Sequence, residues 1–485
     1  MRTRSMKTRS ILALCFRVIA LLCVAAGARA EASTTERPFF VMAPAPQTDP
    51  GSGGSTPLRT PESYGQNNRF WRATGEIFAQ SLIQNLFGKH VMDEKEGFTV
   101  TFDTIEENLH SGMNWDDNSF STNNFRHPYQ GGLYYSAGRS NHYDFYQSSL
   151  FAFAGSWGWE YLGEAHNPSF NDFVNTAVGG IILGEVMYRL STIVLDNTAT
   201  GSSRAWREVG GAVINPVRAF NRIVTGEAFD VHANPAGRYP TSWSTDLRAG
   251  IRTLGEEHLF DGATSKAFVE LAAAYGSPFD PSDEPFDHFD LGLQLNFDNK
   301  PHGIGKIEVQ GLLGKRDLAS ENAVQHVISG YQHFDYLDNE AYTYGGMSFG
   351  AGLWSRFGAS ENLSARTSLH AIGILLGATK NDFFNISGRD YDYGPGAALK
   401  VSAVFTRRKH DLVSLGHESH FIHSVNGGAV NSWVTLNRVR FDVPLRGFLA
   451  SGLDFVVYHS ERDYPGIGRI STRNPELRAY VSWRM

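Results

Sequence analysis

Cysteine is nearly absent from this 485-residue sequence, and its two copies, Cys15 and Cys23, both lie near the start. The rest of the chain can form no disulfide, so its stability must come from a large core or from closed sheet pairing. Neither cysteine follows a small residue, which argues against a lipoprotein signal.

The first thirty residues have the features of a secretory signal peptide. Basic residues occupy four of the first nine positions, an apolar stretch covers 11–26, and Ala28 and Ala30 provide the small residues that a signal peptidase requires. Cleavage is expected after Ala30. The alternative is an uncleaved membrane anchor, which is disfavoured because the apolar run is short for a span and contains Arg17.

Cleavage would leave the chain short of positive charge. Residues 1–30 carry six basic and no acidic side chains, so their removal takes the formal net charge from −7 to −13. This balance argues against a nucleic-acid partner, which requires a basic surface.

Composition divides the remaining chain into three regions. Residues 31–70 are rich in Pro, Gly, Ser and Thr, which predicts a disordered linker. Residues 71–235 have helical character, and residues 240–485 consist of alternating segments separated by turns. The expected fold is therefore mixed, with a mainly helical domain followed by a sheet domain.

The strand pattern is clearest over 289–297, where Phe and Leu alternate with Asp, Gly, Gln and Asn. Such alternation places one face in an apolar medium and the other in a polar one. It recurs over 363–371, 397–405 and 438–443, and about twelve such segments lie between Trp243 and the C-terminus. The pattern predicts an antiparallel outer-membrane β-barrel of about twelve strands. A soluble β-sandwich is the alternative, disfavoured by the number of long strands.

Two partners follow from the barrel prediction. One is outer-membrane lipid. The other is the barrel assembly machinery, because the alternating residues 477–485 resemble the C-terminal signal that this machinery reads. Charged residues on the polar face are expected to line the lumen, and their mixed signs favour internal pairing over an ion-selective path. These residues are Asp290, Lys306, Glu308, Arg366, Lys400, Arg438 and Arg440.

In the helical region, apolar spacing predicts helices over 77–87, 148–165, 177–195 and 205–225, the last broken near Pro216. Another helix should begin after Ser169, which has Asp172 three residues later. Gly180 and Gly184 are four apart, a spacing that lets a second helix approach closely.

Weak candidates for acid–base chemistry also lie in the helical region. Glu160 and Glu164 share a helix face, and His127 lies in a preceding loop. Glu185 is the fourth candidate, although Arg189 is four residues away and would form a structural pair with it. No metal site or cofactor is expected, and the internal-pairing interpretation is favoured over catalysis.

Four motifs carry a resemblance to a known family. They are His127-Pro128 with Gly131 (HPxxG), Trp159-Glu160 with Glu164 (WExxxE), Pro168-Ser169 with Asp172 (PSxxD), and Gly184-Glu185 with Arg189-Leu190-Ser191 (GExxxRLS). In this order they resemble a bacterial cell-envelope family of unknown function, the domain-of-unknown-function 3943 type. The resemblance covers about 110 residues from Trp115 and implies a Gram-negative envelope protein without indicating an activity.

Three functions are compatible with these features. The favoured one is an outer-membrane barrel with a structural or transport role, whose helical domain plugs the lumen or lies in the periplasm. The second is an envelope enzyme that acts on lipid through an acidic and histidine centre. The third is an assembly or binding module at the periplasmic face, whose protein partner the sequence does not identify.

Overall fold

The structure is a computed structural model that describes residues 68–91, 97–235, 237–297, 303–318, 324–360, 362–383, 389–407, 410–426 and 428–484. The expected signal peptide and nearly all of the expected linker lie outside these residues.

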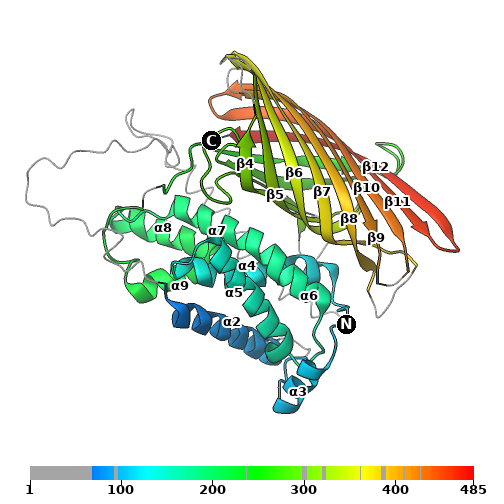
Figure 1. The fold of residues 1–485 in the computed structure, drawn as a ribbon. Coiled ribbons are helices and arrows are strands. Elements are labelled where there is room, and N and C mark those ends of the chain that lie inside the picture. Colours follow the sequence, from blue (N-terminus) through cyan, green and yellow to red (C-terminus); the bar gives the residue numbers. More distant parts are fainter. Residues whose placement is uncertain are drawn as a thin grey trace, which may run out of the picture.

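The C-terminal part forms a closed antiparallel barrel of twelve strands in sequential order, closed by the pairing of β1 with β12 (Figure 1). The expected barrel and its strand number are confirmed. The strands are β1 (Trp243–Leu254), β2 (Thr264–Tyr275), β3 (Phe289–Asn296), β4 (Ile304–Asp317), β5 (Val324–Asp338), β6 (Thr343–Ser360), β7 (Leu363–Lys380), β8 (Tyr391–Arg407), β9 (His410–His423), β10 (Asn431–Arg446), β11 (Leu449–Tyr464) and β12 (Gly468–Arg484).

Contacts across the lumen identify the inward face of the wall. Lys400 on β8 lies 2.6 Å from Asp335 on β5, although β6 and β7 separate these strands in the sheet. Arg440 on β10 likewise lies 3.2 Å from Glu270 on β2. Because side chains alternate along a strand, neighbours of these residues such as Leu399 face outward.

The region before the barrel is a helical bundle with three short π-helical turns, labelled η. Its elements are α2 (Phe70–Val91), α3 (Phe102–His110), η2 (Thr122–Arg126), α4 (His127–Ser140), α5 (Phe145–Gly158), η3 (Trp159–Gly163), α6 (Phe170–Val174), η4 (Asn175–Gly179), α7 (Gly180–Val194), α8 (Gly201–Ile214) and α9 (Pro216–Thr225). Pro216 separates α8 from α9, as the sequence predicts.

The centre of the bundle is a close crossing of α4 and α7. A Cβ atom on Gly131 would lie 1.7 Å from the Thr176 carbonyl oxygen, and one on Gly180 would lie 2.5 Å from the Gly131 Cα. Phe170–Val194 runs as one helix through α6, η4 and α7, long and apolar enough to cross a membrane, but 72% of its most apolar window is buried inside the protein. This helix is therefore the core of the bundle.

The bundle packs on the outside of the barrel wall (Figure 1). Gln332 on β5 donates a hydrogen bond to the Val178 carbonyl (2.9 Å), and Asn175 donates one to the Tyr393 hydroxyl on β8 (3.2 Å). Gln332 and Tyr393 have the opposite strand parity to Asp335 and Lys400, so they face outward.

Outward apolar residues of six consecutive strands share one buried cluster with the helices: Phe289, Val309, Phe334, Met347, Leu376 and Tyr393. Sequence analysis expected the bundle either in the lumen or in the periplasm. In this structure it covers the outer face of β3–β8 instead of filling the lumen.

The α4–α7 crossing yields a test of the bundle core. Replacing Gly180 with alanine should destabilise the bundle by roughly 1–3 kcal/mol, because the added methyl group overlaps the α4 backbone. The measurement is urea unfolding followed by circular dichroism at 222 nm. The control is Gly75→Ala on α2, where a Cβ meets no atom within 4 Å and helix propensity favours alanine. Equal stability of both variants would contradict the crossing.

Candidate functional site

Charged residues from five strands meet inside the barrel. Arg440 bridges Glu270 and Asp454, at 3.2 Å from each, and Arg478 lies 3.3 Å from Glu270. Arg438 contacts Asp454 at 3.0 Å. Glu270 is 3% exposed and Asp454 is fully buried, so side chains fill the lumen at this level. Arg248 on β1 also pairs with Glu270 (2.8 Å), so two carboxylates shared among four guanidinium groups brace the wall from within.

A second polar group lies on the opposite side of the lumen. Lys400 pairs with Asp335 and lies 3.8 Å from Glu418, while Lys306 pairs with Glu308. The charges here are again mixed, and each cation has a carboxylate within reach. These contacts favour internal pairing over a path for ions.

The two remaining residues expected in the lumen have different surroundings. Asp290 accepts a hydrogen bond from Gln310 (2.6 Å) and is half-buried. Arg366 has the same strand parity as the buried Ser368 but is exposed near the start of β7. It therefore takes part in neither of the two networks described above.

Sequence analysis missed Glu270, Asp454 and Arg478. The signal was weak because Ala272–Ala274 interrupts the apolar–polar alternation that would have placed Glu270 on the inward face. Their partners come from strands far apart in the sequence, which only the closed barrel brings together.

Glu185 lies at the junction between bundle and barrel. Its carboxylate, fully buried, lies 2.7 Å from Arg189 Nε and 2.9 Å from Arg139 Nε, and Tyr135 donates a hydrogen bond to it (2.7 Å). Arg189 also donates to the Pro285 carbonyl (2.7 Å) in the β2–β3 loop. Glu185 therefore orients an arginine that ties α7 to the barrel.

The other acidic candidates occupy a separate position at the end of α5. The Ser169 backbone N–H donates to Glu160 Oε2 at 2.7 Å, and Glu160 is 1% exposed. Burial and then the charge of Glu164 raise the pKa of Glu160 well above its ordinary value. Burial and then Asp116 raise the pKa of Glu164 to about 8. Both carboxyl groups therefore favour the protonated form near neutral pH.

His127 lies at the start of α4, where it bonds to Thr176 through Nδ1 (3.2 Å) and approaches Asp172 at 3.7 Å through Nε2. Burial lowers its pKa to about 4, against the opposing charge of Asp116, so the ring is neutral at pH 7.

The four catalytic candidates do not form one centre. Glu185 contacts Tyr135, which lies eight residues, or about 12 Å, beyond His127 along α4. Within the described part of the chain, no group of three or more His, Cys, Asp or Glu side chains is arranged to hold a metal ion. The single acidic and histidine centre of the enzyme hypothesis is thus divided into two buried clusters.

Comparison with known proteins identifies one family. The model described as "Domain of unknown function (DUF3943)" matches residues 112–217, which cover the core of the bundle and a minority of the chain. None of the curated proteins matches this chain.

Among solved structures, the chain is similar to the NanC porin, with 9% identity, a TM-score of 0.26, and coverage of 49% of this chain and 98% of that one. It is also similar to the outer membrane channel DcaP of Acinetobacter baumannii, with 8% identity, a TM-score of 0.24, and coverage of 50% and 96%. The Pseudomonas putida toluene transporter TodX has 8% identity and a TM-score of 0.22, with coverage of 51% and 90%. Likeness at this level carries no inference about function, and the fold rests on the strand pairing itself.

The environment of Glu185 predicts a large stability effect. Glu185→Gln should destabilise the bundle by about 3–5 kcal/mol, because it leaves two buried guanidinium groups without their carboxylate. Urea unfolding measures the effect. The matched control is Glu284→Gln, whose largely exposed side chain lies 3.6 Å from Arg189 and should contribute less than about 1 kcal/mol. A mild effect at both positions would refute the structural role.

The raised pKa of Glu164 predicts a pH dependence. A carboxyl group whose pKa rises on folding stabilises the folded state at low pH, and this contribution is lost as pH rises through the folded value of about 8. His127, with its lowered pKa, acts oppositely but only below about pH 6.5. Between pH 6.5 and 8.5, bundle stability should therefore fall by roughly 2 kcal/mol.

The control for this prediction is a pair of variants measured by the same unfolding assay. Glu164→Gln should flatten the fall, whereas Glu106→Gln, at an exposed position on α3, should retain it. A wild-type stability that rises over this interval would show that Glu164 is ionised in the folded bundle.

Proposed function

We propose that this chain is an outer-membrane β-barrel with a structural or transport-related role, and that its lumen is closed by ion pairs in this state. The observation that carries the proposal is the segregation of side chains across the wall. Charged residues lie on the inner face of the barrel wall, where they form ion pairs, while many large apolar residues on the outer face are exposed.

The apolar outer surface extends over the parts of the wall that the bundle leaves uncovered, which include the far ends of β6, β7 and β8. Outward residues between 38% and 59% exposed include Ile251, Leu353, Leu369, Val401, Leu415, Phe441, Leu453 and Val481. A contiguous apolar surface of this extent is unfavourable in water and is typical of a lipid-facing wall. Closure of the sheet satisfies the backbone hydrogen bonds that lipid cannot satisfy.

The proposal includes a cleaved signal peptide for export and the limits of the two domains. Residues 1–30 would direct export as a cleaved signal peptide, and residues 31–70 would link it to the bundle, although α2 already begins at Phe70. The bundle would span 71–235 and the barrel 240–485. Insertion would depend on the barrel assembly machinery, and outer-membrane lipid would surround the exposed wall.

The four sequence motifs fit structural positions better than catalytic ones. Gly131 of HPxxG lies at the α4–α7 crossing, and Glu160 of WExxxE accepts the backbone N–H of Ser169 from PSxxD. Glu185 and Arg189 of GExxxRLS form the tie to the barrel. We therefore favour a role for these residues in building the bundle over lipid hydrolysis.

Gel migration of the unboiled protein tests the proposal. In an isolated outer-membrane fraction, the protein should migrate differently before and after boiling, because a closed barrel resists detergent at room temperature. A soluble periplasmic protein with identical migration in both lanes would overturn the membrane assignment. The Glu185→Gln variant is a useful control, since loss of the bundle tie should leave the barrel shift intact.

A further inference from the structure

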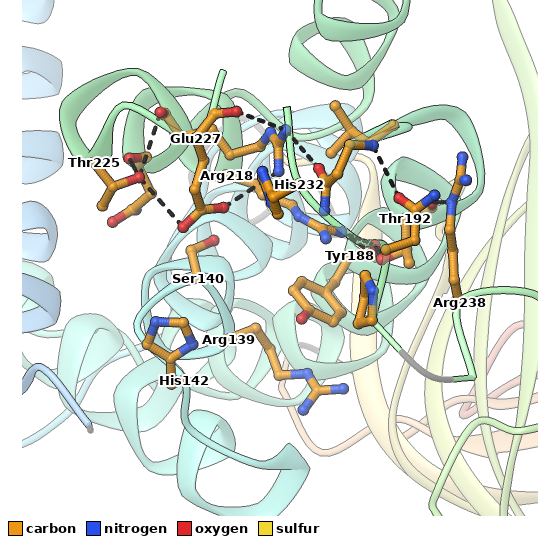
Figure 2. Close-up of a pocket in the computed structure, with 16 residues that line it drawn as sticks. Arg139, Ser140, His142, Tyr188, Thr192, Arg218, Thr225, Glu227, His232 and Arg238 are labelled. Atoms are coloured by element: carbon orange, nitrogen blue, oxygen red, sulfur yellow. Dashed lines mark hydrogen bonds and ion pairs between the residues drawn. The ribbon is translucent and has the colours of Figure 1, made fainter. Parts of the chain in front are cut away.

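A cavity of about 220 Å³ lies in the bundle between α4, α7, α9 and the segment that leads to β1 (Figure 2). Its lining is strongly cationic. Four arginines and two histidines line it, against one carboxylate, Glu227. The basic residues are Arg139, Arg218, Arg222, Arg238, His142 and His232, and the positive charge lies on the four arginines because burial lowers the pKa of His142.

Three of these arginines have acidic partners. Arg139 pairs with Glu185 (2.9 Å), Arg222 with Glu208 (2.7 Å) and Glu227 (3.3 Å), and Arg238 with Asp196 (3.4 Å). Their charges are thus balanced by the protein, and the cationic lining by itself would not identify a ligand.

Arg218 differs from the other three. Its Nη1 donates to the Tyr188 carbonyl (2.9 Å), to Ser191 Oγ (3.0 Å) and to Thr192 Oγ1, all uncharged acceptors. Among the described residues, no carboxylate lies within ion-pair distance of this side chain, and Nε and Nη2 make no hydrogen bond there. Burial lowers its pKa, and Arg222 and Arg139 act in the same direction, while Tyr188 and Glu227 oppose the shift without reversing it. An anion in the cavity would relieve this uncompensated charge.

The Tyr188 ring holds two of the cations in place. The guanidinium groups of Arg139 and Arg218 each lie 4.4 Å from its centroid. Cation–π contacts of this kind restrict both side chains. The cationic site is therefore preorganised before a ligand arrives.

Two other polar atoms of the lining lack partners within the described structure. Ser140 Oγ and Asn221 Oδ1 are buried and make no hydrogen bond. Buried polar groups are normally satisfied, but neither atom is open to the cavity, so each would reach a ligand atom only after its side chain rotates. The hydroxyl can donate to an anionic oxygen, and the amide oxygen can accept from a hydroxyl of the ligand.

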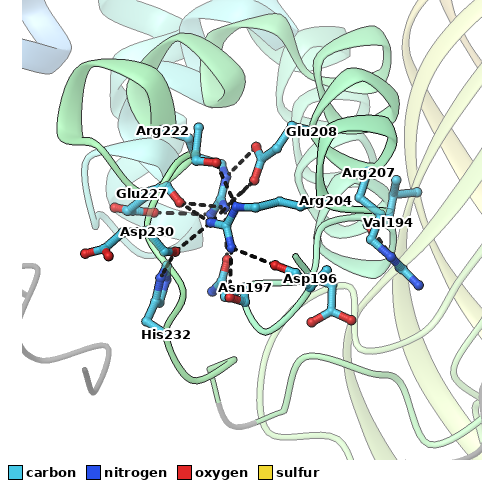
Figure 3. Close-up of polar contacts among 12 residues, drawn as sticks. Val194, Asp196, Asn197, Arg204, Arg207, Glu208, Arg222, Glu227, Asp230 and His232 are labelled. Carbon is cyan, nitrogen blue, oxygen red and sulfur yellow. Dashed lines mark hydrogen bonds and ion pairs between the residues drawn. The ribbon is translucent and has the colours of Figure 1, made fainter. Parts of the chain in front are cut away.

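The loop that closes one side of the cavity is rigidly held (Figure 3). Arg204, 7% exposed, donates to the carbonyl groups of Ala228 (2.7 Å), Asp230 (2.7 Å) and Glu227. It also donates to the Asn197 carbonyl at 2.9 Å. These bonds fix the path of the chain after α9 and position Glu227 and His232 in the lining.

Helix α9 separates this polar cavity from an apolar surface. Arg218, Asn221 and Arg222 line the cavity, while Phe220 and Ile223 on the same helix are more than half exposed. Trp206 on α8 (63%) and Phe229 after α9 (76%) extend the exposed apolar surface. A ligand with a charged head and an apolar tail could contact both.

We propose that this cavity binds a phosphoryl group, with Arg218 as the cation that the ligand neutralises and the Ser140 hydroxyl, once rotated toward the cavity, as a further donor. A phosphate oxyanion matches a fixed guanidinium beside a hydroxyl donor. The phosphoryl group belongs either to a lipid head or to a soluble phosphate ester, and the apolar surface of α8 and α9 favours the lipid. The proposal is independent of whether the barrel conducts.

Isothermal titration of the full chain in neutral detergent tests the proposal. The probes are inorganic phosphate, dihexanoylphosphatidic acid below its micellar concentration, and dihexanoylphosphatidylcholine as the zwitterionic comparison. Binding of phosphatidic acid at least tenfold tighter than that of inorganic phosphate would support a lipid head. Equal binding of these two would support a soluble phosphate ester. No binding of either, or binding of all three without preference, would overturn the proposal.

Variants assign the binding to Arg218. Arg218→Gln should weaken binding by about 10- to 100-fold, the effect of losing a charge-assisted contact. Arg218→Lys keeps the charge and should retain most of the affinity. Arg126→Gln, at an exposed position before α4, should bind as the wild type does. Unchanged binding in Arg218→Gln would refute the assignment, and unaltered circular dichroism would show that each variant is folded.

Discussion

Closure of the sheet between β1 and β12 is the constraint on which the rest of this structure depends. Once the sheet is closed, its interior is narrow, and the inward charges must be neutralised by one another. Four arginines accordingly share Glu270 and Asp454 across five strands: Arg248, Arg438, Arg440 and Arg478. The same side chains fill the lumen at that level, so the helical bundle packs against the outside of the wall.

Attachment of the bundle uses polar contacts set within an apolar interface. Glu185 is buried where α7 approaches the barrel, and its charge fixes Arg189, which in turn donates to the Pro285 carbonyl. Removing α7 from the wall would therefore expose apolar surface and also separate a buried cation from its partners. Because both costs fall on the same helix, detaching the bundle from the wall is strongly unfavourable.

The sequence predicts the architecture wherever a short repeat of residue types determines the secondary structure. The alternation at Phe289–Asn296 and the glycine spacing at Gly180 depend only on local geometry, so the strands and the close helix crossing could be anticipated. Tyr391 and Tyr393 show the limit. They begin β8 and accept hydrogen bonds from Asn123 and Asn175 of the bundle, which no local pattern indicates. An outward aromatic residue has the same pattern whether it contacts lipid or protein.

Charge balance separates the structural polar residues from the proposed binding site. Glu185 and the lumen carboxylates each have cationic partners at short distance, so their positions are explained by the fold alone. Arg218 has only uncharged acceptors among the described residues, yet it is held by Tyr188 beside a cavity lined by two unsatisfied polar atoms. A protein gains no stability from a half-buried cation that it leaves uncompensated. An anionic ligand bound in the cavity would therefore supply the negative charge that Arg218 lacks.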